Sequence, residues 1–144
     1  MEPLTLSSGD AMPSSPALEP LGREQCLALL ATSGLGRVVY THRALPAVQP
    51  VRFALWDDAV VFRAPASSAL FAAALDTVVA LEADHFAQDL ASGWFVTLLG
   101  RANELRDRQV IAQLAGLPLQ SWGNGAGDRY VRVPVASISG NRIR

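Results

Sequence analysis

The amino-acid sequence predicts a mainly β domain in which six antiparallel strands form a closed or split barrel, with short helices at its ends. Three observations favour this fold class. Segments rich in Val, Phe and Tyr recur along the chain, the turns between the first three of them are short, and no strand–helix–parallel-strand unit repeats. Closing such a sheet removes the exposed edges that a small β domain otherwise has to protect.

The chain is expected to contain one domain, spanning residues 21–144, after a flexible tail. Residues 1–20 carry prolines and serines and no periodic apolar face, so they offer nothing to bury. Order is expected to begin with a helix over residues 23–32, where apolar side chains recur at helical spacing. Ser33 and Gly34 provide its end.

The strands and the remaining helices follow from alternation and turn residues. The six strands are expected at residues 36–41, 47–55, 59–63, 77–83, 93–105 and 129–142. Gly100 suggests a bend within the fifth strand, and Pro134 interrupts the sixth. Short helices are expected at 67–74 and 107–115, with loops at 84–92 and 117–127.

Composition excludes several classes of function. The formal net charge is -1, and all 12 basic side chains are arginines that lie scattered along the chain, which argues against nucleic acid as a ligand. Lysine-based catalysis is excluded because no lysine exists. The single Cys26 and the lack of a signal peptide or a bilayer-spanning apolar run predict a cytoplasmic protein with no membrane partner.

No residue is expected to act as a covalent or acid–base catalyst. The sequence has no GxSxG elbow, and its only imidazoles, His42 and His85, have no second ligand at metal spacing. No metal site is therefore expected. An absent acid–base constellation fits an enzyme whose cofactor carries the chemistry.

Two arginines are candidates for binding an anion. Arg63 ends an apolar strand just before a helix start, so it is either a phosphate clamp or an exposed strand-end charge. Arg52 lies between Val51 and Phe53 and points either inward to an anion or outward to solvent. 

The neighbouring polar and aromatic side chains have two interpretations each. Ser67 and Ser68 suit an N-cap, and the same geometry can bind phosphate. Trp94 and Trp122 either stack on a ring system or pack in the core or a dimer interface.

The order and spacing of several strings resemble the pyridoxamine 5'-phosphate oxidase-like family of FMN-binding split barrels, in particular its small actinobacterial-type and nitroimidazole-reductase-like branches. The strings are GRVVYT at 36–41, ALPAVQPVRFAL at 44–55, DDAVVFRAPASSALFAAA at 57–74, VVALEADHF at 78–86, GWFVTLLGRANEL at 93–105 and RYVRVPVASISGNRI at 129–143.

This resemblance implies a homodimer that binds FMN, or in some branches a deazaflavin, between two barrels and transfers hydride to or from a small-molecule substrate. By resemblance, the flavin phosphate lies near Arg63, the 64–69 loop with Ala64, Ser67 and Ser68, and Arg52 and Phe53 on the adjoining strand. The ring faces Trp94 and Phe95, and the partner subunit contributes the regions of Trp122 and Arg129.

Four positions depart from the family pattern. Relatives usually have Thr at Ala64, Lys at Ala69, Asn at Arg52 and Ser or Gln at Phe95. Each lost charged contact to phosphate is worth about 1.5 to 3 kcal/mol, or about one to two decades in affinity. Arg52 is a candidate replacement for the missing Lys.

The departures also motivate a second hypothesis, a non-catalytic split barrel that binds a cofactor, a haem or another protein. In the haem version, His42 or His85 would be the axial ligand.

Overall fold

The computed structural model describes residues 18–123, 125 and 127–144. It is mainly β, and nine antiparallel strands of the described chain follow one another in the order β1-β9-β6-β5-β2-β3-β4-β8-β7. The strands are β1 (Leu18–Pro20), β2 (Leu35–His42), β3 (Leu45–Trp56), β4 (Ala59–Pro65), β5 (Val78–Phe86), β6 (Gly93–Arg101), β7 (Asn103–Leu105), β8 (Asp128–Pro134) and β9 (Ser137–Ile143). The helices are α1 (Arg23–Thr32), α2 (Ala69–Ala74) and α3 (Arg108–Leu114).

The antiparallel split-barrel class was predicted, but the number of strands was not. The segment expected as the fifth strand divides at Ala102 into β6 and β7, because the amide and carbonyl of Ala102 bond to Thr77 and Asp76 instead of a neighbouring strand. The segment expected as the sixth strand divides after Pro134 into β8 and β9, and these two strands pair with different neighbours.

The remaining additional strand is β1. Leu18–Pro20 was assigned to the tail, and instead pairs with Asn141, Arg142 and Ile143 of β9. All three residues of β1 are exposed, and they are held by backbone pairing with β9 and by the hydrogen bond from Arg144 Nε to Glu19 Oε1 at 2.8 Å. Sequence pattern does not reveal such pairing with a distant segment. Residues 1–17 lie outside the described residues.

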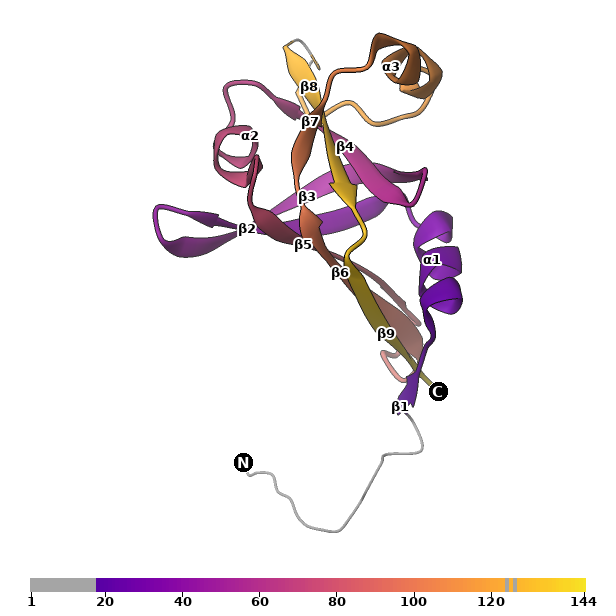
Figure 1. Ribbon diagram of the computed structural model, residues 1–144. Helices are drawn as coiled ribbons and strands as arrows, with labels where there is room; N and C mark the ends of the chain where they lie inside the picture. The colour runs from indigo at the N-terminus through magenta and orange to yellow at the C-terminus, as the bar shows by residue number, and fades with distance from the viewer. Residues whose placement is uncertain (1–17, 124, 126) are drawn as a thin grey trace.

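The inner face of the sheet carries the main core. Alternate residues of β2, β3, β5 and β6 point inward, because successive side chains of a strand alternate between faces. They pack with Cys26 and Leu30 of α1 and with Leu70 and Ala74 of α2. Figure 1 shows α1 beside β9 and the long β2–β3 hairpin projecting from the body of the sheet.

A second, smaller core covers the outer face at one end of the sheet. Val61 of β4, Leu114 of α3 and Leu119 are buried together there, with Trp56 and Tyr130 packed against them. The α3 helix and the segment that follows it therefore cover β4 and β8, as Figure 1 shows, and leave the outer face of β2, β5 and β6 without this cover.

No helix in the described part of the chain has the length and apolar composition that crossing a bilayer requires.

Candidate functional site

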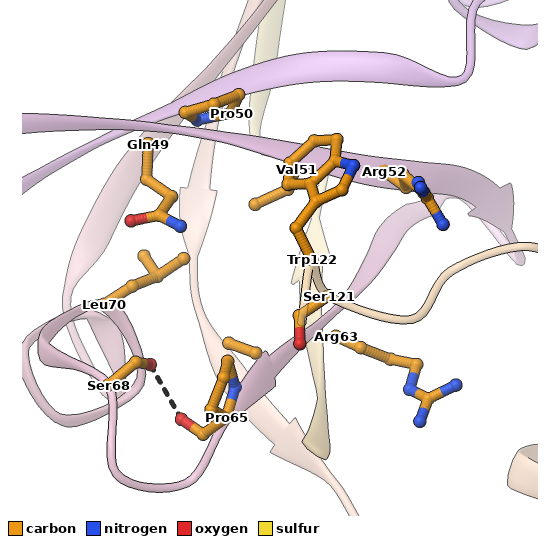
Figure 2. A pocket seen from close by; sticks show the side chains of 11 residues that line it. Gln49, Pro50, Val51, Arg52, Arg63, Pro65, Ser68, Leu70, Ser121 and Trp122 are labelled. Carbon is orange, nitrogen blue, oxygen red and sulfur yellow. Dashed lines mark hydrogen bonds between the residues drawn. The ribbon is translucent and has the colours of Figure 1, made fainter. Parts of the chain in front are cut away.

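A pocket lies where β3, β4, α2 and the segment after α3 meet (Figure 2). It is lined by Gln49, Pro50, Val51, Arg52, Arg63, Ala64, Pro65, Ser68, Leu70, Ser121 and Trp122. Five of the residues proposed from the sequence therefore come together here: Arg52, Arg63, Ala64, Ser68 and Trp122.

Arg52 is the charged group of the pocket that has no carboxylate partner among the described residues. Val51 and Phe53 on either side of it are buried, so alternation along β3 turns Arg52 to the outer face. Its guanidinium carbon lies 5.2 Å from the centre of the Trp122 ring, within the range of a cation–π contact. Of the two orientations considered for Arg52, the outward one is present.

Trp122 contributes an aromatic surface beside this cation. Half of its side chain is exposed, and Figure 2 shows the indole ring extending across the pocket toward β3. A large aromatic ring that stays half exposed next to a cation is a surface on which a second planar group can stack.

Arg63 has a different role within the chain. Its Nε atom lies 3.3 Å from Asp128 Oδ2, and the Asp128 side chain is fully buried. Its Nη2 atom donates to the Gly125 carbonyl at 3.4 Å, and its guanidinium carbon lies 5.4 Å from the Tyr130 ring centre. In Figure 2 the guanidinium points away from Ser68, so Arg63 lines the pocket mainly with its stem.

Asp128 is a residue that the sequence interpretation missed. Its two carboxylate oxygens accept from the Ser121 amide at 2.9 Å and from Ser121 Oγ at 2.6 Å. Asp128 therefore holds both Arg63 and the segment that carries Trp122. The only signal in the sequence was an acidic residue between a glycine-rich loop and a strand, which is too common to identify a partner.

Ser68 is the N-cap of α2, as expected. Its Oγ accepts from the Phe71 amide at 3.1 Å and donates to the Pro65 carbonyl at 2.7 Å. Because both interactions use the hydroxyl within the chain, capping is the role that its geometry shows. Ser67 is exposed and does not line the pocket, and Ala64 is buried against the main core.

The other candidate residues lie outside this pocket. Phe53 is buried in the main core, and Trp94 is also buried there, opposite His85 in the neighbouring strand. Phe95 lies on the other face of β6, where it is half-buried. Arg129 donates to Glu104 Oε2 at 2.7 Å, with its guanidinium carbon 6.0 Å from the Phe71 ring centre. A single subunit therefore does not bring Trp94 or Phe95 to the Arg52 pocket.

The imidazoles do not line the pocket either. His42 ends β2 and His85 is exposed on β5, and the described residues contain no group of three metal-ligating side chains.

Comparison with known proteins identifies the class. The sequence model of the family described as pyridoxamine 5'-phosphate oxidase matches residues 22–142, which is most of the chain. The chain belongs to this family, which confirms the resemblance seen in its strings.

Individual relatives agree with this assignment. An uncharacterized protein of Mycobacterium tuberculosis is 34% identical over 128 residues, which cover 85% of this chain and 84% of that protein. The solved structure of an FAD binding protein from Mycobacterium smegmatis has a TM-score of 0.74 and 30% identity, covering 87% of this chain and 97% of that one. A putative pyridoxamine 5'-phosphate oxidase from Corynebacterium glutamicum has a TM-score of 0.74 and 24% identity, covering 91% and 97%, and supports the fold.

Proposed function

We propose that this protein is a flavin-dependent oxidoreductase that works as a homodimer and binds its flavin in the pocket of Arg52 and Trp122. The observation that carries the proposal is the pairing of these two side chains. Arg52 presents a guanidinium with no carboxylate partner among the described residues, and Trp122 presents a half-exposed aromatic surface 5.2 Å away. A phosphorylated planar ring needs one group of each kind.

The charge distribution of the pocket supports binding of a phosphate. Arg63 is compensated by the buried Asp128, so Arg52 supplies the uncompensated positive charge. A guanidinium can hold two phosphate oxygens through parallel N–H donors, and it remains charged at every physiological pH. We infer that Arg52 takes the place that Lys occupies at position 69 in relatives.

FMN is the flavin that we propose as the cofactor. Its single phosphate matches the single uncompensated guanidinium, and the family resemblance implies the same cofactor. FAD is the second candidate, since the relative from Mycobacterium smegmatis is described as an FAD binding protein. The diphosphate of FAD would need a further cation, which a partner subunit could provide. A deazaflavin is the third candidate, on the resemblance alone.

Homodimer formation completes the proposed site. Trp94 and Phe95 are remote from the Arg52 pocket within one chain, so any contact that they make to the ring would come from a second copy. We expect the dimer to act in the cytoplasm, which remains a prediction from the sequence.

Hydride transfer is the chemistry that a flavin supplies when it is bound. The residues of this chain would bind and orient the cofactor: Arg52 through the phosphate, Trp122 through the ring, and Asp128 by holding the Trp122 segment through Ser121. No Asp, Glu, His, Cys, Tyr or Lys side chain lines the pocket within one subunit, so we expect proton transfer to be left to the substrate and solvent.

An absorption spectrum followed by titration tests the proposal. Freshly purified protein is scanned between 300 and about 600 nm and then titrated with FMN, FAD and a deazaflavin, with Trp fluorescence as a second signal. We expect the flavin absorption bands, a saturable titration, and bleaching by NADH or NADPH without oxygen. Binding without bleaching would favour the non-catalytic alternative, and a Soret band would favour haem. A protein that binds none of the three flavins would contradict the proposal.

A further inference from the structure

Gln49 lines the candidate pocket and has no role in the contacts described so far. It lies on β3, three residues before Arg52, and its side chain is exposed. Figure 2 shows this side chain extending from β3 into the pocket, and in that view the Trp122 ring lies between Gln49 and Arg52. The pocket therefore has a neutral amide on one side of the indole and a guanidinium on the other.

The pocket lies at the point where β3 leaves β2 and joins β4. Residues 45–52 of β3 pair with β2, and residues 53–56 pair with β4. Before Phe53, no described strand pairs with the edge of β3 that faces β4. Side chains from both faces of a strand reach the space beside an open edge, because they alternate across the strand. Gln49 and Arg52 belong to opposite faces and line the same pocket for this reason.

The amide of Gln49 is available to a ligand. Among the other polar side chains of the pocket, Arg63, Ser68 and Ser121 each bond to groups of the chain. Neither the Gln49 amide nor the Arg52 guanidinium makes a hydrogen bond to any described residue. A carboxamide carries two donors and an acceptor in one plane, so it can pair with a planar group that offers a donor beside an acceptor.

The pyrimidine edge of a flavin has this pattern. It carries an N–H donor at N3 between two carbonyl acceptors. The Gln49 amide can accept from this N–H and donate to the neighbouring carbonyl at the same time, in the plane of the ring. Neither bond involves a charge, so this pairing adds to the phosphate contact proposed for Arg52 without competing with it.

The spacing along β3 suits a single ligand. Residues 49 and 52 are about 10 Å apart along the strand, since each residue advances it by about 3.3 Å. In FMN, the central ring and the extended ribityl chain separate the pyrimidine edge from the phosphate. Trp122 offers a stacking surface between the two ends, and Pro50 and Leu70 add apolar surface beside Gln49.

We propose that Gln49 pairs with the pyrimidine edge of the flavin and makes the pocket selective for a ring that carries the N3 hydrogen. This inference rests on the proposed function, because it assigns a residue of the same pocket. It adds a specificity that the other contacts do not provide, since any phosphorylated aromatic ring can satisfy Arg52 and Trp122. A site that hydrogen-bonds a ligand group discriminates against an analogue that lacks the group.

Titration with FMN and with 3-methyl-FMN, in which a methyl group replaces the N3 hydrogen, tests this role. Dissociation constants are measured by flavin fluorescence at fixed pH and ionic strength. We expect the wild type to bind FMN at least about tenfold more tightly than 3-methyl-FMN, the effect of losing one or two neutral hydrogen bonds. The analogue 5-deaza-FMN keeps the pyrimidine edge and should bind within about threefold of FMN.

Two variants connect this preference to Gln49. Gln49→Leu removes the amide, and its preference for FMN over 3-methyl-FMN should fall below about threefold because FMN binds more weakly. The control Gln113→Leu makes the same change at an exposed position of α3 and should keep the wild-type preference. Since Gln49 is exposed, we expect Gln49→Leu to melt like the wild type in thermal unfolding.

The outcomes separate this inference from the proposed function. A Gln49→Leu variant that retains the wild-type preference overturns the role of Gln49 and leaves flavin binding intact. Equal affinity of the wild type for FMN and 3-methyl-FMN has the same meaning. A wild type that binds none of the flavins overturns the proposed function and this inference together.

Discussion

Replacing Arg63 by methionine removes the cation that faces Asp128 while keeping much of the side-chain stem. The Asp128 carboxylate is fully buried, and Arg63 Nε lies 3.3 Å from it. This Nε atom is itself buried and makes no hydrogen bond to any described residue. The contact is therefore mainly coulombic. Its loss leaves a buried carboxylate to which, among the described residues, Ser121 alone still donates hydrogen bonds.

The expected destabilisation follows from this arrangement. Removing one member of a fully buried ion pair costs about 3 to 5 kcal/mol. Arg63 is 21% exposed, and two hydrogen bonds from Ser121 to Asp128 survive, so we expect the lower value of about 2 to 3 kcal/mol. In a chain of this size that corresponds to a melting temperature lowered by about 6 to 10 °C.

A double-mutant cycle measured by thermal and urea unfolding checks the reasoning. The single variants are Arg63→Met and Asp128→Asn, and the double variant should be more stable than the sum of their effects predicts. Flavin affinity is measured on the same samples. An Arg63→Met protein that melts like the wild type but no longer binds flavin would refute the structural role and restore the phosphate clamp predicted from the sequence.

Three further variants test other parts of the structure. Ser68→Ala removes the α2 cap and should lower unfolding free energy by about 1 kcal/mol in urea titration. Gly100→Ala places a Cβ 2.0 Å from the Pro134 carbonyl oxygen and should cost at least about 2 kcal/mol, whereas Gly34→Ala meets nothing within 4 Å and should unfold like the wild type. Two guanidiniums lower the pKa of Glu104. Wild type should therefore be more stable than Glu104→Gln at pH 7, and this difference in unfolding free energy should diminish as the pH falls below about 4. Denaturant unfolding of both proteins at pH 7 and below pH 4 measures the difference.

Much of the fold was predictable because it depends on local pattern. The helix at residues 23–32 was predicted with the bounds that the structure has, and the β2–β3 and β3–β4 hairpins follow from alternation and tight turns. The division of β6 from β7 was not predictable, since it depends on hydrogen bonds between Ala102 and residues Asp76 and Thr77, which link α2 to β5, and no local signal encodes these bonds. The pairing of β1 with β9 was not predictable for the same reason, because it joins segments far apart in the sequence.

The candidate site could likewise be predicted only in part. Arg52 was selected as a charge within an apolar strand, and Arg63 and Ser68 from their places at a strand end and a helix start. All three line one pocket. What sequence could not provide was the neutralisation of Arg63, because Asp128 reaches it only through the pairing of β4 with β8. The distinction between a compensated and an uncompensated arginine exists only in three dimensions.

The flavin affinity of Arg52 variants tests the central claim most directly. Wild-type protein, Arg52→Gln and the control Arg108→Gln, which removes an exposed charge on α3, are titrated with FMN at fixed ionic strength, with flavin fluorescence as the readout. The account predicts that Arg52→Gln weakens binding by about 10- to 100-fold, the loss of one charged contact to phosphate, while Arg108→Gln binds as the wild type does. Equal affinity in all three proteins would contradict it.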